Sequence, residues 1–303
     1  MRVWLRRTLR VLAVLFVLLG IAYYWFLVED HAPGGGQFNI DIAEVRRLAN
    51  SLPGSKPQAI GVEQVALYRF PAAAVMAGDS WRMVDLPVFS YQLDHSTIID
   101  TAMDEKLSND AGVSSFDPVA YGRMRKALAQ ASLIVLTHEH PDHIGGLTVQ
   151  PDLARVLKAT RLTREQVDHP ERMGSATWPA GALTGYQALQ YDRYAAIAPG
   201  VVLIKSPGHS PGSQMVFVQK ADGVEVLFLG DVAWHIQNVE RVRERPRLVT
   251  QFLLKEDRAA VFSELAELNR LSKAEPQVHL VPGHDGKVVA TLAEQKVLRQ
   301  GFE

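Results

Sequence analysis

The chain has 303 residues, of which 47% are apolar and 21% charged, a composition typical of a globular protein with one large domain or two ordinary ones. Its formal net charge is -1 and it has no long basic run, so nothing in the sequence indicates nucleic acid as a partner. The absence of cysteine excludes disulfides, thiol nucleophiles and thiolate metal sites, so any metal ion has to be held by histidine and carboxylate.

The first predicted element is a membrane anchor. Residues 11–28 form an unbroken apolar run of the length that spans a bilayer. A basic tail, residues 1–10, precedes the run, and Glu29 and Asp30 follow it, so the positive-inside rule places the tail in the cytoplasm and the rest of the chain on the extracytoplasmic, periplasmic side. A signal peptide cleaved from a secreted protein is the alternative. The bulky aromatic exit of the run, which lacks the small residues of a cleavage site, favours the anchor.

Residues 29–60 predict a linker that contains one short helix. The stretch after Asp30 is rich in glycine and proline. Asp41, with Glu44 three residues later, is typical of a helix start. The sequence leaves open whether this helix is a stalk or packs on the domain that follows.

From residue 61 onwards, short apolar strands alternate with helical patterns, which predicts an α/β or mixed α+β domain. The predicted strands are residues 62–70, 87–93, 96–100, 132–136, 200–206, 213–219, 224–230 and 277–281. The predicted helices are residues 116–131, 151–160, 163–173 and 258–272. The stretch 174–200 is less regular, and two roles stay open for its rings: capping an active site or packing the domain. These rings belong to Trp178, Tyr186, Tyr191 and Tyr194.

The segment "THEHPDH" after the strand 132–136 concentrates residues that bind metal ions. His138 and His140 are two positions apart, so in an extended chain they project from the same side and can hold one ion. Pro141 suits the first turn of a helix. Beyond that bend, Asp142 and His143 can point towards a second ion. A polar surface turn is the competing interpretation of this segment.

Other predicted strands also end at potential ligands. His209, Asp231 and His284 each follow an apolar strand closely, and a further strand ends at Asp100. Because ligands at the carboxyl ends of neighbouring strands converge on one cleft, His209 can complete the first site, His284 the second, and Asp231 can bridge them. Nitrogen and carboxylate ligands without sulfur favour two Zn²⁺ ions, with Mn²⁺ or Fe as alternatives.

At this point the sequence resembles the metallo-β-lactamase superfamily. "THEHPDH" has its H-x-H-x-D-H form, and "SPGHSPGS", "FLGD" and "VPGHD" match its later metal motifs in order, over roughly residues 65 to 285. The resemblance implies an αββα sandwich with a dinuclear site at one edge. It implies the following roles: His138, His140 and His209 on the first metal, Asp142, His143 and His284 on the second, Asp231 as the bridge, and Asp100 orienting a ligand from behind.

Within the superfamily, the chain most resembles the lactonases that open acyl-homoserine lactones, which share the "PGH-[ST]-PG" turn and a terminal "GHD". The absence of cysteine argues against the most familiar β-lactamase subclass, and the short segment after His284 argues against glyoxalase II enzymes. Those lactonases carry a tyrosine three residues after the bridging aspartate. This chain has Trp234 there, whose indole N–H can contact a substrate.

Two further features are given ordinary interpretations. Four arginines, interleaved with Glu240 and Glu244, are predicted to form a solvated face, with an anionic-substrate site as the alternative. They are Arg241, Arg243, Arg245 and Arg247. His235 is predicted to be a surface or structural histidine.

The sequence therefore predicts a single-pass, membrane-anchored dinuclear-zinc hydrolase whose residues 61–303 form the metallo-β-lactamase-like domain. A metal-bridging hydroxide would attack an ester-type, lactone-like carbonyl of a small-molecule substrate, and Asp142 would pass a proton to the leaving oxygen. A phosphodiesterase that uses the same metal site and the arginines, or a non-catalytic metal-binding homologue, are the alternatives.

Overall fold

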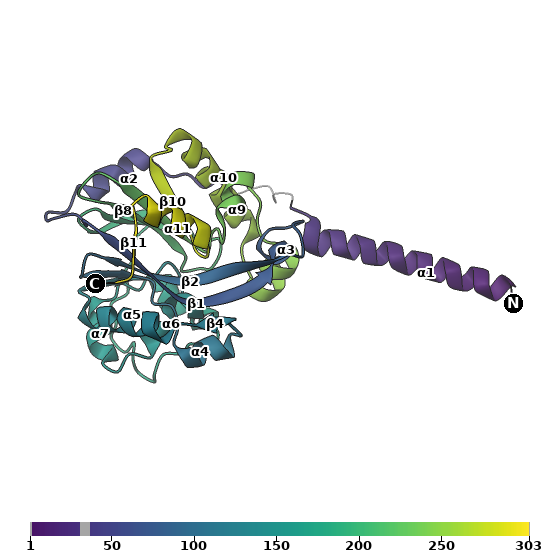
Figure 1. Cartoon of the computed structure of the whole chain (residues 1–303), viewed down its shortest axis with the longest axis horizontal. Helices are drawn as coiled ribbons and strands as arrows, with labels where there is room; N and C mark the ends of the chain where they lie inside the picture. The colour runs from purple at the N-terminus through teal and green to yellow at the C-terminus, as the bar shows by residue number, and fades with distance from the viewer. Residues whose placement is uncertain (1, 31–36, 303) are drawn as a thin grey trace.

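A computed structural model describes residues 2–30 and 37–302 of the chain. Two β-sheets pack face to face, helices cover both outer faces, and one long N-terminal helix projects from the body (Figure 1). This is the αββα arrangement that the resemblance implied, so the expected fold class is confirmed.

The first sheet has the strand order β11-β1-β2-β3-β5, with β4 paired to β1. Its strands are β1 (Ile60–Pro71), β2 (Met83–Leu93), β3 (Thr97–Ile99), β4 (Ser115–Phe116), β5 (Leu133–Val135) and β11 (Arg299–Gln300). The long β1–β2 hairpin is antiparallel, whereas β3 and β5 run parallel and therefore end at the same edge. The short strand β11, which the sequence did not predict, pairs with the start of β1.

The second sheet has the strand order β10-β9-β8-β7-β6. Its strands are β6 (Tyr194–Ala198), β7 (Val201–Lys205), β8 (Gln214–Gln219), β9 (Glu225–Gly230) and β10 (Val278–Pro282). β6 lies inside the stretch predicted to be irregular. Its residues are all half-buried and three of them are alanine, so no alternation of apolar and polar positions marks it as a strand.

The apolar faces of the two sheets form the central core. Phe89 and Tyr91 of β2 face Phe228 of β9, and the rings of Tyr91 and Phe228 lie 4.5 Å apart between centroids. Burying such rings contributes about 1.5–3 kcal/mol each. This interface fixes the two sheets relative to each other, and with them the strand ends that carry the predicted ligands.

Helices form the outer layers. Those on the first sheet are α4 (Glu105–Asp110), α5 (Pro118–Gln130), α6 (Pro141–Thr148) and α7 (Leu153–Ala159), followed by α8 (Arg164–Asp168) and the 3₁₀ turn η2 (Pro170–Met173). Those on the second sheet are α2 (Ile42–Ala49), α9 (Ile236–Arg241) and α10 (Arg258–Ala274). Three more elements are α3 (Ala72–Val75) in the β1–β2 connection, the π-helix η3 (Leu248–Leu254), and α11 (Gly286–Glu294) against the central core.

The helix predicted within the linker packs on the domain. Asp41 caps α2 by accepting a hydrogen bond from the backbone N–H of Glu44, as the sequence indicated. Val45 and Ala49 are buried against the second sheet, so α2 belongs to the outer layer and is not a free stalk. The glycine-rich part of the predicted linker, residues 31–36, lies outside the described residues.

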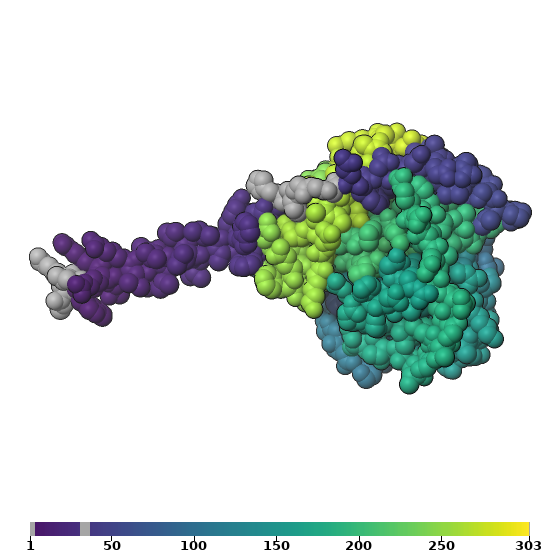
Figure 2. All heavy atoms as spheres, turned by 180° about the vertical axis from the view of Figure 1, so that it is seen from behind, coloured from purple at the N-terminus to yellow at the C-terminus, as the bar shows by residue number. Residues whose placement is uncertain are grey.

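The predicted anchor is a single exposed helix. α1 (Arg2–Tyr23) continues directly into the π-helical turn η1 (Tyr24–Val28). Trp4–Val28 is a helical span of 25 residues whose most apolar 18-residue window has a mean hydropathy of 2.5, and none of that window is buried in the protein (Figures 1 and 2). By length and composition this helix can cross a membrane, and a signal sequence near an N-terminus would have the same properties.

Helix α6 carries two of the predicted ligands and lies unusually close to the end of β3. A Cβ atom added to Gly146 would lie 2.0 Å from the carbonyl oxygen of Thr101, so only glycine permits this approach. The backbone N–H and hydroxyl of Thr101 both donate to the carbonyl of His143. The glycine thus allows the helix to be held against the strand from which Asp100 projects.

Candidate metal centre

Five of the predicted site residues follow the carboxyl ends of strands from both sheets. Asp100 follows β3 and His138 follows β5, while His209, Asp231 and His284 follow β7, β9 and β10. The remaining three come from the start of α6. His140 is the residue before its first turn, Pro141 occupies that turn, and Asp142 and His143 lie on it.

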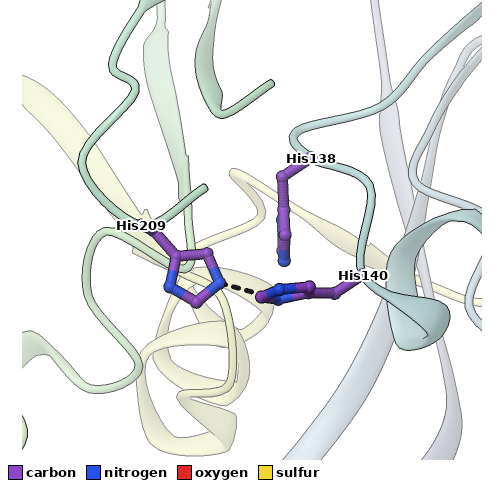
Figure 3. A group of neighbouring side chains, drawn as sticks. All are labelled: His138, His140 and His209. Atoms are coloured by element: carbon purple, nitrogen blue, oxygen red, sulfur yellow. Dashed lines mark hydrogen bonds between the residues drawn. The ribbon is translucent and has the colours of Figure 1, made fainter. Parts of the chain in front are cut away.

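The first group consists of His138, His140 and His209. One nitrogen from each ring lies within 4.8 Å of the others, and all three rings point to a common centre (Figure 3). His209 Nε2 and His140 Nδ1 are 2.9 Å apart. The three ring planes are nearly perpendicular to one another, at 82°, 83° and 87°.

The second group consists of Asp142, His143 and His284, again within 4.8 Å of one another. Asp231 lies between the two groups. Its carboxylate oxygens are 3.2 Å from His284 Nε2 and 3.3 Å from His143 Nε2. They are also 3.7 Å from His209 Nε2. The structure therefore brings together all seven residues predicted as ligands, with Asp231 in the position of a bridge, while their binding of metal stays a prediction.

Three polar atoms at this centre have no hydrogen bond. Within the described chain, His138 Nε2, His143 Nε2 and Asp231 Oδ1 are buried without a hydrogen bond. Leaving such groups unsatisfied costs about 1–3 kcal/mol each. The unpartnered atoms point at one another across a space ringed by nitrogen and carboxylate oxygen, a donor set suited to zinc. The residues present therefore fit a pair of divalent metal ions.

The histidines of the two groups lie in different electrostatic environments. Burial, reinforced by neighbouring imidazoles, holds the pKa of His138 and His140 well below the usual range, so both rings are neutral and keep a lone pair for a metal ion. Burial also opposes charge on His143, but the carboxylates of Asp100 and Asp231 outweigh it and raise the pKa of His143 well above its ordinary value. The second group thus lies in a negative potential that attracts cations.

Asp100 lies behind the second group, and its role in orienting a metal ligand stays a prediction. Its carboxylate accepts hydrogen bonds from the backbone N–H of Thr137 at 2.7 Å and from the hydroxyl of Thr137 at 2.8 Å. It also lies 2.8 Å from His143 Nδ1, which leaves His143 Nε2 directed at the centre. This contact fixes the tautomer and the orientation of the ring.

Two buried glutamates hold the loop of His209, and sequence reasoning missed both. Glu256 accepts from His209 Nδ1 at 2.5 Å and is itself paired with Arg245. Glu139, between the first two histidines, accepts from the hydroxyl of Ser210 and the backbone N–H of Gly212. The position of Glu139 inside the histidine motif was a usable signal. Nothing in the sequence around Glu256 distinguishes it from a surface residue.

The prediction of a solvated arginine face is wrong for Glu244 and Arg245, each only 1% exposed. Arg245 lies between Glu256 and the ring of Trp234, with its guanidinium carbon 4.8 Å from the ring centroid. Arg247 pairs with Glu29, and Arg243 pairs with Asp30. Three of the four arginines are thus occupied by acidic partners that lie outside the run.

A cleft with a volume of about 660 Å³ opens above the centre. His140, Asp142, Asp231 and His284 lie in its lining, and Tyr68 of β1 joins them. Trp234 also lines the cleft, but its indole N–H donates to Asp231 at 2.6 Å. The geometry therefore gives Trp234 a role in holding Asp231, and its predicted contact with substrate stays a prediction.

The other singled-out side chains lie away from the centre. The hydroxyls of three tyrosines from the region 174–200 bond to the fold itself, and none of the three lines the cleft. They are Tyr186, Tyr191 and Tyr194. These rings therefore pack the domain. His235 lines a separate cavity, where its Nε2 is 3.3 Å from the carbonyl oxygen of Asp85.

Comparison with known proteins gives a consistent result. A family model described as the metallo-beta-lactamase superfamily matches residues 87–284. An N-acyl homoserine lactonase of Bacillus thuringiensis subsp. kurstaki is 24% identical over 201 residues, which cover 57% of this chain and 78% of that protein. A hydroxyacylglutathione hydrolase of Albidiferax ferrireducens is 35% identical over 102 residues, 34% of each chain.

Solved structures show the same fold. The crystal structure of a quorum-quenching N-acyl homoserine lactone lactonase superposes with a TM-score of 0.59 at 19% identity, covering 78% of this chain and 95% of that one. An N-acyl homoserine lactone hydrolase with the product N-hexanoyl-L-homoserine bound at its catalytic metal center superposes with a TM-score of 0.58, also at 19% identity. It covers 78% of this chain and 96% of that chain.

We predict that the chain binds two metal ions. After removal of metal, the full chain in detergent should take up two Zn²⁺ at saturation, measured by elemental analysis. His284→Ala should retain one ion, because it removes a ligand of the second group alone, and Asp231→Ala should weaken both sites. Affinity should fall with acid, since protons and metal ions compete for the same ring nitrogens.

His169→Ala is the matched control. His169 pairs with the exposed Glu171 in a segment that contributes no predicted ligand, so this variant should bind as the unmodified chain does. At most one bound ion in the unmodified chain at saturating zinc would contradict the dinuclear site.

Proposed function

The chain belongs to the metallo-β-lactamase superfamily, and on that premise we propose that it is a membrane-anchored dinuclear-zinc hydrolase of ester-type, lactone-like bonds. The observation that carries the proposal is the position of the seven clustered ligands at the base of a cleft with largely apolar walls. The lactonases that it resembles act on cyclic esters, which is the source of the proposed bond type.

Two bound ions would polarise a substrate carbonyl and supply a water molecule of lowered pKa. On our proposal His138, His140 and His209 hold one ion, Asp142, His143 and His284 hold the other, and Asp231 contacts both. The indole N–H of Trp234 holds Asp231 in place, and Arg245 supports the ring of Trp234. Mn²⁺ or Fe would fit the same donor atoms.

Asp142 is the proposed proton donor to the leaving oxygen. Its side chain is 14% exposed, more than that of the ligands behind it, and it lines the cleft. A carboxylate at the edge of the metal group can contact both the centre and a substrate. It is therefore placed to move a proton where the ester bond breaks.

Tyr68 is the proposed hydrogen-bond donor to the substrate. Burial, together with the carboxylates of Asp142 and Asp231, raises the pKa of Tyr68, so its hydroxyl stays protonated and available. Its contact within the protein is a weak one, with Met103 Sδ at 3.9 Å. On β1, Tyr68 is better suited than Trp234 to donate a hydrogen bond to the substrate, because the indole N–H of Trp234 already donates to Asp231.

The alternatives have less support. A phosphodiesterase was supported by the arginine run, and Arg243, Arg245 and Arg247 are each paired with a carboxylate. The complete set of predicted ligands, which faces an open cleft with an available hydrogen-bond donor, argues against a non-catalytic homologue.

The proposed activity is tested by hydrolysis. The metal-loaded full chain should hydrolyse lactones and aryl esters in preference to phosphodiesters and nitrocefin. A chelator should abolish the activity, and Zn²⁺ or Mn²⁺ should restore it. His138→Ala should lower kcat/KM by several orders of magnitude, while His169→Ala should not. Activity that survived both chelation and His138→Ala would show that this centre is not the catalyst.

Tyr68→Phe should lower kcat by about 10²-fold or more while leaving metal content unchanged, because it removes one donor to a developing oxyanion. Tyr186→Phe is the control, since the Tyr186 hydroxyl bonds to the backbone of Thr160 away from the cleft. An unchanged kcat for Tyr68→Phe would remove this residue from the reaction.

We also infer that α1 crosses the membrane and leaves the hydrolase domain outside the cytoplasm. The basic residues before the span and the acidic pair after it support this orientation. A reporter that is active only outside the cytoplasm, fused after Glu303, should be active, and the chain should stay with membranes after an alkaline wash. Release of a shortened soluble protein would instead identify a signal peptide.

A further inference from the structure

An exposed apolar segment lies beside the mouth of the cleft. In the π-helix η3, Leu248, Phe252 and Leu253 are 50%, 65% and 67% exposed. We call these three residues the rim patch. Single exposed apolar side chains are ordinary on soluble proteins, but three of them in one turn of a seven-residue segment need a partner.

The rim patch stands against the end of the apolar span. The ring of Phe252 meets that of Phe26 edge to face, with centroids 5.8 Å apart. Figure 2 shows the yellow-green part of the chain, which includes η3, against the base of the purple helix. Since Phe26 belongs to the span Trp4–Val28, the rim patch lies at the level of the last turn of that span.

Polar contacts fix this arrangement. The guanidinium of Arg247 lies over the ring of Trp25, 4.1 Å from its centroid, and pairs with Glu29 at 2.5 Å. The backbone N–H of Gly78, beyond α3, donates to the carbonyl of Leu27 at 2.8 Å. The helix end is thus attached to the domain at two places, so the depth of the span in a bilayer sets the depth of the rim patch.

The same segment forms one wall of the cleft. Leu253 and Leu254 line it together with the ligands, and the guanidinium of Arg172 donates to the carbonyl of Leu254 at 2.7 Å. Phe70 of the β1–β2 hairpin also lines the cleft and is 36% exposed. Trp81 and Met83 of that hairpin are exposed as well, outside the cleft lining. Apolar side chains from both η3 and the β1–β2 hairpin therefore line the cleft, and both segments contact the end of the span.

We propose that the rim patch lies in the interfacial region of the lipid bilayer and that the cleft receives its substrate from the membrane. The partner is the bilayer surface, and the substrate class is an amphipathic ester whose acyl chain is dissolved in the lipid. The substrate part rests on the proposed hydrolase function, while the position of the rim patch does not. Lys255, exposed directly after η3, provides a cation at the level of the lipid phosphates.

The position is tested by labelling, because α1 alone would keep the protein with membranes in any fractionation. The chain has no cysteine, so Phe252→Cys and Leu253→Cys each give a single site for an environment-sensitive fluorophore. The full chain is reconstituted in phosphatidylcholine–phosphatidylglycerol vesicles with or without lipids that carry a quenching nitroxide. Both labels should emit at shorter wavelength and be quenched by the nitroxide lipids.

Val119→Cys is the matched control. Val119 is an apolar residue that is 64% exposed at the start of α5, a helix of the first sheet's outer layer that is drawn away from α1 in Figure 1. Its label should emit as in water and remain unquenched. Labels at 252 and 253 that behave like the one at 119 would overturn the proposal.

Delivery of substrate is tested by comparing two esters. Phe252→Asp and Leu248→Asp change exposed residues outside the cleft lining. Both variants should lower hydrolysis of a long-chain ester dissolved in the vesicles by about tenfold or more and leave hydrolysis of a water-soluble short-chain ester unchanged. The control Val119→Asp should leave hydrolysis of both esters unchanged. An equal loss on the two esters would overturn delivery from the membrane. Absence of hydrolysis in the unmodified chain would instead contradict the proposed function and leave the labelling result standing.

Discussion

Each imidazole of the metal centre has two nitrogens, and the fold has to direct one to the centre and hold the other. The holding groups come from separate parts of the chain. Asp100 after β3 holds His143, Glu256 before α10 holds His209, and the carbonyl of Pro87 in β2 holds His284 at 2.9 Å. Because Asp100 and Pro87 lie on the first sheet, while His209 and His284 follow strands of the second, these contacts form only when the two sheets are packed in their native register. The central core of β2 against β9 and the metal centre therefore depend on each other.

Arg245 supports residues of both groups of predicted ligands. A buried guanidinium is costly unless it is paired, and here the carboxylate of Glu256 and the ring of Trp234 both contact it. Through Glu256 it supports His209 of the first group, and through Trp234 it supports Asp231, which lies between the groups. One buried cation thus stabilises the negative charge on which both groups rely. The burial of such a residue depends on neighbours that are distant in the sequence, so no local sequence pattern predicts it.

This distinction explains what the sequence could predict. The residues predicted as ligands, and Asp100, could be picked out because they follow short apolar strands or lie in the histidine-rich segment after one, a signal contained in a short stretch of chain. The start of α2 at Asp41 was found for the same reason. The burial of Arg245 and the role of Glu256 depend on contacts between β9, η3 and α10, and alternating arginine and glutamate looks the same on a surface and in a buried ion pair. β6 was missed because its alanine-rich residues carry no strand pattern.

The walls of the cleft follow a different rule from its base. Predicted metal ligands line the base, whereas other lining residues come from β1, η2 and η3. The indole N–H of Trp234 donates to Asp231, and on our proposal the phenol of Tyr68, which also lines the cleft, provides the hydrogen-bond donor to the substrate. The β1–β2 hairpin that carries Tyr68 also contacts the end of the apolar span through Gly78. On our proposals, the hairpin that offers a donor to the substrate is also the hairpin that contacts the membrane helix, so the chemistry and the membrane would lie on the same side of the domain.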